Sequence, residues 1–404
     1  MSQRLDCEVL VVGAGPAGAE LARLLAQAGV DVVLVDRLAD LRQAAFSSAA
    51  LPLEALTRFG LPASVVAARW RGWAIVGPNQ QHYQWVAERP LGAVLDFGPL
   101  RLWLADQAQA WGAALRLGWT ALGCDSLESG LDPAMVTSLR RRDGHTCTLT
   151  SRYVVDASGE GRALLGDPAD SNQALVTGLG VEWLLQVPQP LEASWRDRLS
   201  FFLGTQWLPQ GYGWIFPMAP GQLKVGVCRL RDDRQRQPPL TTALHTLLDA
   251  SGLQQAQVID RHGGRIRSSI NRRELHHRGR LLGLGDVVST ANLLGGEGIR
   301  HALTSARVLA PLLQEALAHP SRSEGLLQAY PGQLRHALGR RWNLSGRLAR
   351  RTWLGLVDGR ADRRLERLLT GLQTKRAEDL SALLFDYRFE RYGLKALPYL
   401  FGWR

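Results

Sequence analysis

The chain has 404 residues, enough for two or three domains with a large buried core. The net charge is +11, but residues 331–404 hold 16 Lys and Arg against 7 Asp and Glu, so the rest of the chain is nearly neutral, which argues against a nucleic-acid partner. Four scattered cysteines without a C-x-x-C pair argue against a zinc site, a thiol redox centre or a disulfide framework, and no apolar run is long enough to span a bilayer.

The first predicted elements form a dinucleotide-binding unit. Residues 9–12 and 31–35 are apolar runs typical of buried parallel strands, and residues 17–28 predict a helix between them. A G-x-G-x-x-G turn joins strand to helix, where glycines allow close approach to a pyrophosphate that the helix N-terminus attracts. Asp36, at the end of the second strand, falls where a carboxylate binds ribose hydroxyls. The residues predicted to bind the nucleotide here are Gly13, Gly15, Pro16, Ala17, Gly18, Asp36 and Arg37.

The sequence of the middle of the chain indicates further elements of the nucleotide-binding unit, followed by a separate sheet. Residues 99–112 predict a helix with Arg101 in its first turn, and residues 153–155 predict a strand that leads into Asp-Ala-Ser-Gly. From about residue 165 to 275, aromatic and polar residues alternate and Trp and Pro are frequent. This pattern favours an inserted sheet domain.

A second glycine-containing segment lies some 270 residues after the first. Residues 281–284 are an apolar run, Gly285 and Asp286 follow, and residues 299–317 predict a helix. The N-terminal motif alone fits NAD as well as FAD. The two segments together favour an FAD site, because they are the two ends of one flavin-binding pattern.

The last part of the chain, from about residue 331, predicts basic helices. Leu365, Leu368, Leu369 and Leu372 recur at the spacing of one apolar helix face. Two interpretations stay open: the region lies on an anionic membrane surface, or its apolar stripe packs on the body of the protein. Because the nucleotide unit starts within the first ten residues, no signal peptide is expected, and we predict a cytoplasmic protein with peripheral membrane contact as an open alternative.

These elements predict an α/β fold, α+β overall, with a Rossmann-like FAD-binding domain, an inserted β-sheet substrate domain and a C-terminal helical region. The predicted FAD-binding domain is discontinuous and comprises residues 1–75, 98–165 and 276–330. The predicted substrate domain comprises residues 76–97 and 166–275, and the basic helical region comprises residues 331–404.

Two motifs carry a resemblance to a known group. Residues 211–217 read GYGWIFP and are followed by Val-Gly-Val at 225–227, and residues 296–299 read GEGI. On these motifs, the chain resembles the p-hydroxybenzoate hydroxylase-like FAD-dependent oxidoreductases and, within them, the geranylgeranyl reductase family. The likeness covers about residues 7–320.

The resemblance implies FAD as the cofactor and an isoprenoid double bond as the substrate. It places Arg101 at the FAD phosphates, Asp286 near the ribityl chain, and loop 295–298 at the pyrimidine edge of the flavin, where a helix N-terminus favours negative charge. The further residues that it assigns to the cofactor are Gly285, Gly296, Gly298 and Ile299. Tyr212, Trp214 and Phe216 alternate along one strand and would line an apolar cavity, with a core aromatic ladder as the alternative.

The chain departs from the family pattern at three places. Ser47 stands at the position of a family cysteine within Pro-Cys-Gly-Gly, residues 287–289 read VVS in place of Ala-Ala-Gly, and Leu293 replaces a proline. We therefore keep other functions open: an FAD-dependent monooxygenase or halogenase, a redox-neutral enzyme similar to lycopene cyclases, or a non-catalytic flavin-binding protein. The halogenase pattern W-x-W-x-I-P is not met, because Tyr212 and Phe216 replace two of its residues.

No second dinucleotide motif is present, so NADPH that binds transiently, or a reduced ferredoxin docked on the Arg-rich tail, is expected to supply electrons. No catalytic residue is assigned: Glu297 is more typical of a loop that binds through its backbone than of an acid. No metal site is predicted, and His276 and His277 are expected on a surface turn. Trp70, Trp73 and Trp85 would either wall a polyprenyl tunnel or pack in the core.

Overall fold

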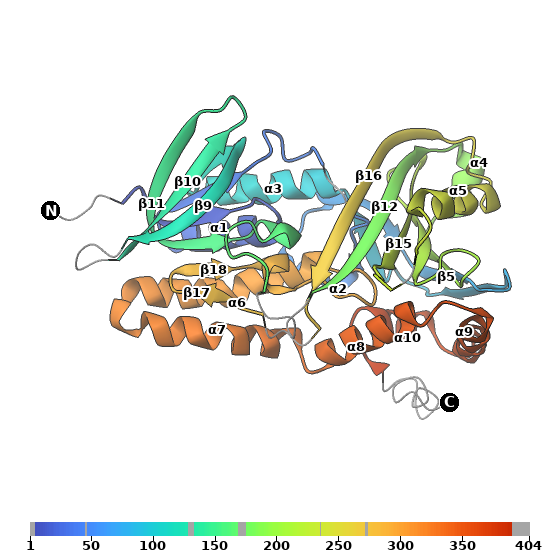
Figure 1. Ribbon diagram of the computed structural model, residues 1–404. Helices are drawn as coiled ribbons and strands as arrows, with labels where there is room; N and C mark the ends of the chain where they lie inside the picture. Colours follow the sequence, from blue (N-terminus) through green and yellow to red (C-terminus); the bar gives the residue numbers. More distant parts are fainter. Residues whose placement is uncertain are drawn as a thin grey trace.

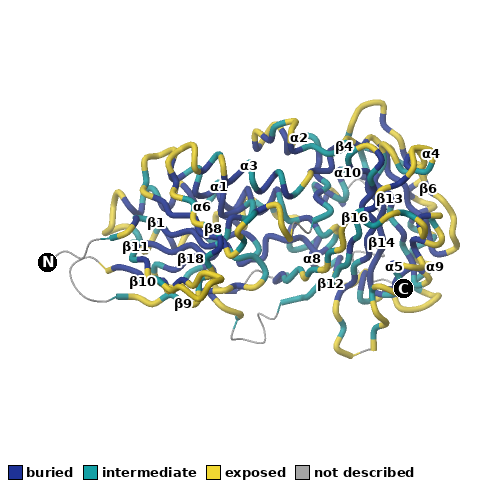
Figure 2. Tube along the Cα trace, turned by 90° about the horizontal axis from the view of Figure 1, so that it is seen from above, coloured by how far each residue is buried: buried dark blue, intermediate teal, exposed yellow. Residues whose placement is uncertain are grey.

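The computed structural model describes residues 5–44, 47–127, 133–168, 175–234, 236–270 and 274–389. The chain forms two parts that lie side by side, each built on one large sheet, and helices α8 to α10 run along the second part (Figure 1). Buried residues run through the interior of both sheets, while exposed residues gather in the peripheral loops (Figure 2). The predicted α/β fold is confirmed.

The first part contains an eight-stranded sheet with the order β17-β18-β11-β1-β2-β8, which β10 and β9 extend from β11. Its central strands β18, β11, β1, β2 and β8 are parallel, the arrangement of a Rossmann-like fold. The strands are β1 (Cys7–Val12), β2 (Val32–Asp36), β8 (Ala114–Leu117), β9 (Trp119–Leu127), β10 (Ala134–Arg141), β11 (Thr146–Asp156), β17 (His277–Arg278) and β18 (Leu281–Gly283).

Helices cover one face of this sheet. Alternate residues of β1 pack with the apolar sides of these helices, while the other residues of β1 pack with β10 on the opposite face. Both faces of the parallel strands are therefore buried, which explains why β1 and β2 are nearly continuous apolar runs. The helices are α1 (Pro16–Gln27), α3 (Phe97–Ala110), α6 (Ile299–Ala318) and α7 (Ser323–Leu338).

The second part contains a seven-stranded sheet with the order β16-β12-β15-β14-β13-β5-β6. Helix α5 (Leu240–Ala250) packs on one face, and an aromatic-rich cluster lies on the other. The predicted domain boundary after residue 75 falls inside β5. The strands are β5 (Gly72–Val76), β6 (His82–Val86), β12 (Val176–Gln186), β13 (Arg198–Leu203), β14 (Gly211–Pro217), β15 (Gln222–Leu230) and β16 (Gln257–Ser268).

A small three-stranded sheet is formed by residues 50–95, and β5 and β6 of the seven-stranded sheet lie between its last two strands in the sequence. It has the order β3-β7-β4 and precedes α3. Its strands are β3 (Ala50–Pro52), β4 (Val66–Trp70) and β7 (Gly92–Leu95), and the short helix α2 (Leu53–Phe59) follows β3. The other short helix, α4 (Gln189–Ala193), belongs to the second part, between β12 and β13.

The last helices pack on the aromatic face of the seven-stranded sheet. They are α8 (Arg341–Leu354), α9 (Gly359–Leu372) and α10 (Ala377–Leu384). Trp85 donates a hydrogen bond from Nε1 to the carbonyl of Leu372 at 3.0 Å, and Trp73 donates to Ser381 at 3.0 Å. The apolar stripe of α9 faces this body, with Leu369 and Leu372 buried. Residues 390–404 of the predicted basic region lie outside the described residues.

Two further observations bear on the predicted tail. The predicted boundary at residue 331 falls inside α7, which begins at Ser323 and carries Pro331 within it. Among the described residues, no helix combines the length and the apolar character that a membrane crossing needs.

Candidate active site

The glycine-rich turn between β1 and α1 uses its glycines for two purposes. A Cβ atom on Gly13 would lie 2.3 Å from the carbonyl oxygen of Ala157, and one on Gly18 would lie 2.0 Å from the carbonyl oxygen of Gly13. These two glycines therefore allow helix and strands to pack. A Cβ on Gly15 would meet nothing within 4 Å, and Gly15 lines an open cleft. Gly15 leaves the room that a phosphate group needs above the turn.

Asp36 at the end of β2 holds the turn in place. Its carboxylate accepts hydrogen bonds from the backbone N–H groups of Ala14 at 2.7 Å and Leu38 at 2.8 Å. A carboxylate offers about four acceptor sites, so acceptor capacity remains for ribose hydroxyls. The neighbouring Arg37 is exposed.

Arg101 on α3 is a buried cation near Asp36. It is 7% exposed, and its only polar partner among the described residues is the carbonyl oxygen of Gln43, at 3.2 Å. Burial lowers the pKa of Arg101, and the charge of Asp36 opposes that shift. A buried guanidinium without a carboxylate on it is expected to take an anionic ligand.

The Gly-Asp segment closes on the turn from the other side. Gly285 has a φ of +64°, and a Cβ there would lie 2.8 Å from the Cβ of Ala17. Asp286 accepts a hydrogen bond from Thr290 at 2.9 Å and lines the cleft. Burial raises the pKa of Asp286, while the hydrogen bond from Thr290 and the charge of Arg162 act against that rise.

Ser289 shows how the chain accommodates a departure from the family pattern. It stands where the family has glycine, and it keeps a left-handed φ of +58° that glycine favours. Its hydroxyl accepts hydrogen bonds from Arg162 at 3.1 Å and from the N–H of Ser269 at 2.9 Å. These bonds hold the unfavourable backbone conformation in place.

Two helix N-termini face the same cleft. Helix α1 follows Gly15 and helix α6 follows Gly298, and neither has a side chain capping its first N–H groups. Free N–H groups and the positive end of the helix dipole attract negative charge. The cleft can therefore stabilise a diphosphate at α1 and negative charge on a flavin ring at α6.

The cleft has an empty volume of about 1450 Å³ between the two large sheets. Its lining includes the predicted residues Gly15, Pro16, Ala17, Gly285, Asp286, Gly296, Gly298 and Ile299. Gly13 and Gly18 pack behind this lining, and Asp36, Arg37 and Arg101 lie around the end of β2 rather than in the lining. The open space at Gly15, the guanidinium of Arg101, which no carboxylate of the described residues pairs with, and the two uncapped helix ends fit FAD.

The three aromatic residues of β14 share one face of the seven-stranded sheet, as alternation predicts. Tyr212 and Phe216 line both the cleft and a second cavity, whereas Trp214 lines only the cleft. Trp214 donates a hydrogen bond from Nε1 to the buried Glu182 at 3.0 Å. Tyr212, Trp214 and Phe216 therefore pack in the core and also line the cleft, and two of them line the second cavity.

The second cavity adjoins the cleft and has an empty volume of about 880 Å³. Ser47 and Ser48, at the segment where the family pattern is lost, line both spaces, as do Gly296 and Trp353. Of the three tryptophans considered for a tunnel, Trp73 lines this cavity, and Trp70 and Trp85 are buried. The larger apolar and aromatic side chains of its wall are Leu51, Trp73, Ile75, Leu199, Phe201, Leu203, Tyr212, Phe216, Leu294, Ile299, Trp353, Leu384 and Phe385.

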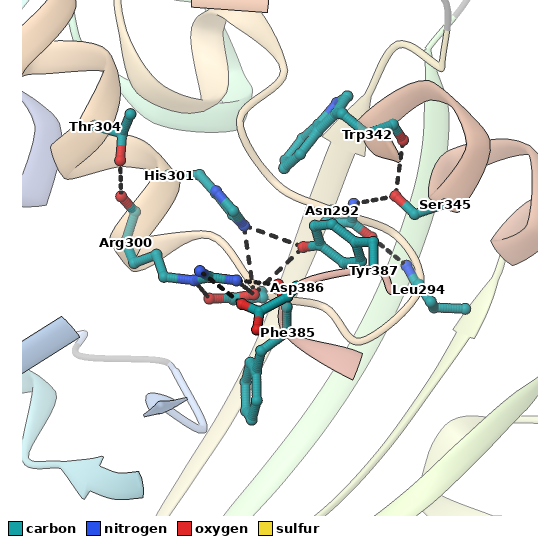
Figure 3. Close-up of polar contacts among 11 residues, drawn as sticks. Asn292, Leu294, Arg300, His301, Thr304, Trp342, Ser345, Phe385, Asp386 and Tyr387 are labelled. Atoms are coloured by element: carbon teal, nitrogen blue, oxygen red, sulfur yellow. Dashed lines mark hydrogen bonds and ion pairs between the residues drawn. The ribbon is translucent and has the colours of Figure 1, made fainter. Parts of the chain in front are cut away.

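Glu297 lines the cavity and belongs to a buried polar network with Arg300, His301 and Tyr387. Figure 3 shows these three partners. Arg300 donates two hydrogen bonds to its carboxylate, His301 Nε2 lies 3.4 Å from Oε2, and Tyr387 donates to Oε2 at 3.3 Å. Burial disfavours the charged carboxylate, but His301 and Arg300 outweigh burial and lower the pKa of Glu297 to about 2. Glu297 is therefore ionised near neutral pH.

Sequence reasoning missed the contribution of the last helices to this site. Trp353 of α8 donates a hydrogen bond to the carbonyl of Leu293 at 3.2 Å, and Leu384 and Phe385 line the cavity. No local pattern links these residues to loop 295–298, because they lie far apart in the sequence and carry no motif.

The prediction that His276 lies on a surface turn is wrong. It is 2% exposed, and its ring centroid lies 5.8 Å from that of Tyr330, because it directly precedes β17, which pairs with the buried strand β18. Within the described part of the chain, no group of three or more His, Cys, Asp and Glu side chains could hold a metal ion.

Comparisons with known proteins agree with this geometry. The profile of a family described as "FAD binding domain" matches residues 6–342. The chain is 26% identical over 332 residues to a digeranylgeranylglycerophospholipid reductase of Haloferax volcanii, covering 78% of this chain and 77% of the relative. It is 27% identical over 372 residues to a menaquinone reductase of Mycobacterium tuberculosis, covering 86% and 85%. A geranylgeranyl bacteriochlorophyll reductase-like protein from Thermoplasma acidophilum has a similar fold, with a TM-score of 0.79, 20% identity, and coverage of 97% of this chain and 99% of that one.

Proposed function

The chain belongs to the FAD binding domain family, and from that premise we propose that it reduces carbon–carbon double bonds of a geranylgeranyl or other polyprenyl lipid. It is an FAD-dependent oxidoreductase. The observation that carries the proposal is the apolar lining of the cavity that adjoins the FAD cleft at loop 295–298. A cavity with so few polar groups suits a hydrocarbon chain better than a polar aromatic substrate.

The named relatives support the same substrate class. One is a reductase of a digeranylgeranylglycerophospholipid and another a reductase of menaquinone. Both names point to lipid substrates. The cavity of this chain is lined by Trp73, Phe201 and Phe216, which offer apolar surface to such a substrate.

The protein contributes mainly alignment to this chemistry. Bound FAD, once reduced, supplies the hydride. An isolated alkene has no carbonyl for the protein to polarise. Most of the rate acceleration must therefore come from cavity walls that hold the double bond in position. Free N–H groups at the start of α6 stabilise negative charge on the flavin side of the site.

We infer that Tyr212 delivers the proton. Among the polar side chains of the cavity wall, Glu297 is ionised and Arg300 is bound to it, and the indole N–H groups of Trp73 and Trp353 donate to other acceptors, which leaves the hydroxyl groups of Tyr212, Ser47 and Ser48. We choose Tyr212 because its hydroxyl oxygen would lie only 3.2 Å from a Cβ on Gly296, in the loop predicted to meet the flavin, and because a phenol is more acidic than an aliphatic hydroxyl. Burial raises the pKa of the Tyr212 hydroxyl well above its usual range, which keeps the phenol protonated but also makes it a weaker acid, so the assignment rests on the position of the hydroxyl beside Gly296. The hydroxyl lies at the junction of cleft and cavity.

The substitution Tyr212→Phe tests this role. Loss of a general acid is expected to lower kcat by roughly 10²-fold while FAD affinity stays unchanged. The measurement is single-turnover reoxidation of reduced enzyme by substrate, in H₂O and D₂O. A rate equal to that of the wild type would show that another group supplies the proton.

We further propose that NADPH or a reduced ferredoxin supplies the electrons. We also propose that the exposed arginines of α8 and α9 contact an anionic membrane or an acidic donor protein. A cytoplasmic location fits this proposal. The two donors are separated by mixing each with the FAD-loaded protein without oxygen and recording the rate of flavin bleaching.

The first experiment is anaerobic. The purified protein is photoreduced, and its visible spectrum is recorded while polyprenyl lipids are added. Reoxidation of the flavin together with a product heavier by two hydrogens supports the reductase. If the flavin stays reduced until air is admitted, a monooxygenase or halogenase is favoured. If the substrate is converted without a change in mass, a cyclase is favoured. If the substrate has no effect at all, a non-catalytic flavin-binding protein is favoured.

A further inference from the structure

A strap of residues 385–389, which follows α10, supplies part of the cavity wall. Phe385 is 8% exposed, and its ring stacks on Trp70 with 5.9 Å between ring centroids. The same ring lies 5.8 Å from Trp73, which lines the cavity beside it. The Phe385 side chain therefore fills the space between the cavity and the buried Trp70.

The polar network around Glu297 holds the strap in position (Figure 3). Arg300 donates a hydrogen bond to the carbonyl oxygen of Phe385, and its guanidinium lies 3.8 Å from the carboxylate of Asp386. Tyr387 contacts Glu297 at 3.3 Å and His301 Nε2 at 3.1 Å. Buried, charge-assisted contacts of this kind define one arrangement of the groups they join.

This network joins the wall to the flavin loop. Glu297 belongs to loop 295–298, which lines both the cleft and the cavity, and Arg300 lies in the first turn of α6. The position of the Phe385 ring is thus set relative to the loop at which the reacting double bond must lie. Because the Phe385 ring lies at a fixed distance from loop 295–298, it limits the length of prenyl chain that fits beyond the reacting double bond.

We propose that Phe385 is a specificity-determining residue that limits the length of the polyprenyl chain that the cavity accepts. The inference rests on the proposed function for its substrate class. A cavity that gains or loses space for one small apolar group changes its preference between homologous ligands by about 10- to 200-fold.

The test compares four variants of the full, FAD-loaded protein: Phe385→Ala, Phe385→Leu, Phe385→Trp and Phe389→Ala. Phe389 is the matched control, because it lies in the same strap and is buried against Trp342 and Tyr387 rather than in the cavity wall. The ligands are geraniol, farnesol, geranylgeraniol and the next longer prenyl alcohol. Binding is measured from the change in the spectrum of bound FAD, so that turnover is not needed.

Phe385→Ala and, to a smaller degree, Phe385→Leu are expected to raise the affinity for the longest alcohol relative to farnesol by about tenfold. Phe385→Trp is expected to shift this ratio in the opposite direction, and Phe389→Ala to leave it at the wild-type value. If Phe385→Ala does not fold, the chain-length profiles of Phe385→Leu and Phe385→Trp test the inference.

Two results would overturn the inference. One is a wild-type length profile in a Phe385 variant that binds FAD and melts as the Phe389 control does. The other is failure of the wild type to bind any of the alcohols. If the wild type binds them and the variants shift the profile, but reduced enzyme transfers no hydrogen to them, the inference stands and the proposed reaction is wrong.

Discussion

Gly15 and Gly13 lie two residues apart in the same turn, yet they have different physical roles. A side chain on Gly13 would meet backbone, whereas one on Gly15 would enter the cleft, and the backbone of Gly15 has a φ of −74° that any residue adopts. Gly15→Ala is therefore expected to leave the melting temperature of the apoprotein unchanged and to weaken FAD binding at least about tenfold, because a methyl group occupies the phosphate position. An FAD titration followed by flavin fluorescence measures the affinity.

The control is Gly13→Ala. It combines a φ of +110° with a close approach to Ala157, so it is expected to lower the melting temperature of the apoprotein itself. Unchanged FAD affinity in Gly15→Ala would mean that the phosphates lie elsewhere.

The lowered pKa of Glu297 predicts how the free energy of unfolding changes at low pH. Its pKa in the folded protein is about 2, below the ordinary value of 4.5, so its contribution to stability is fully present above the ordinary value and is lost as pH falls toward 2. Glu297→Gln also leaves the buried Arg300 without its carboxylate, which costs about 3–5 kcal/mol near neutral pH. Urea unfolding at several pH values between about 6 and 3 measures both proteins. The difference in their free energies of unfolding is expected to shrink as pH falls, and a constant difference would contradict the assigned pKa.

At the scale of elements, α9 illustrates a helix held by one apolar face. Leu369 is 1% exposed against the seven-stranded sheet, while Arg363 on the same helix is exposed. Leu369→Ala is expected to lower the free energy of unfolding by about 2–5 kcal/mol, because it leaves a cavity in the aromatic cluster. Arg363→Ala, the matched control, is expected to stay within about 0.5 kcal/mol of the wild type. Equal effects in urea unfolding would mean that α9 does not pack as described.

The elements also show how far sequence reasoning reaches. Periodicity predicted β1, α1, β14 and the apolar face of α9, because each depends on neighbours within a few residues. The predicted start of the tail at residue 331 falls inside α7, because a proline can lie within a helix as well as mark its end. The glycine turn and loop 295–298 were predicted as parts of the site because they carry motifs. Phe385 and Trp353 reach the cavity only through tertiary packing, which leaves no periodic signal.

At the scale of the whole molecule, charge and apolar surface are separated in the C-terminal region. The leucine stripe of α9 packs inside the protein, so a membrane contact made by α9 would rest on charge rather than on insertion of apolar side chains. The exposed arginines of α9 are Arg360, Arg363, Arg364 and Arg367. We expect the protein to sediment with liposomes that contain anionic lipid at low salt, and to be released as salt is raised.

The matching variant changes these four arginines to glutamine. It is expected to lose most of the sedimentation, since each basic residue near an anionic surface contributes about 1 kcal/mol. Liposomes of neutral lipid serve as the control. Equal sedimentation of the variant and the wild type would exclude α9 as the contact.

The order in which the ribosome makes the chain has a consequence for how the enzyme matures. The groups that bind FAD are complete once α6 has been synthesised, whereas Phe385 emerges 85 residues after its partner Arg300. Because domains tend to fold as they emerge during synthesis, a nascent chain can hold its cofactor before it has a closed pocket for lipid. Chains stalled between α6 and α10 are therefore expected to bind FAD without chain-length selectivity, exposing reduced flavin to oxygen until the last wall is in place.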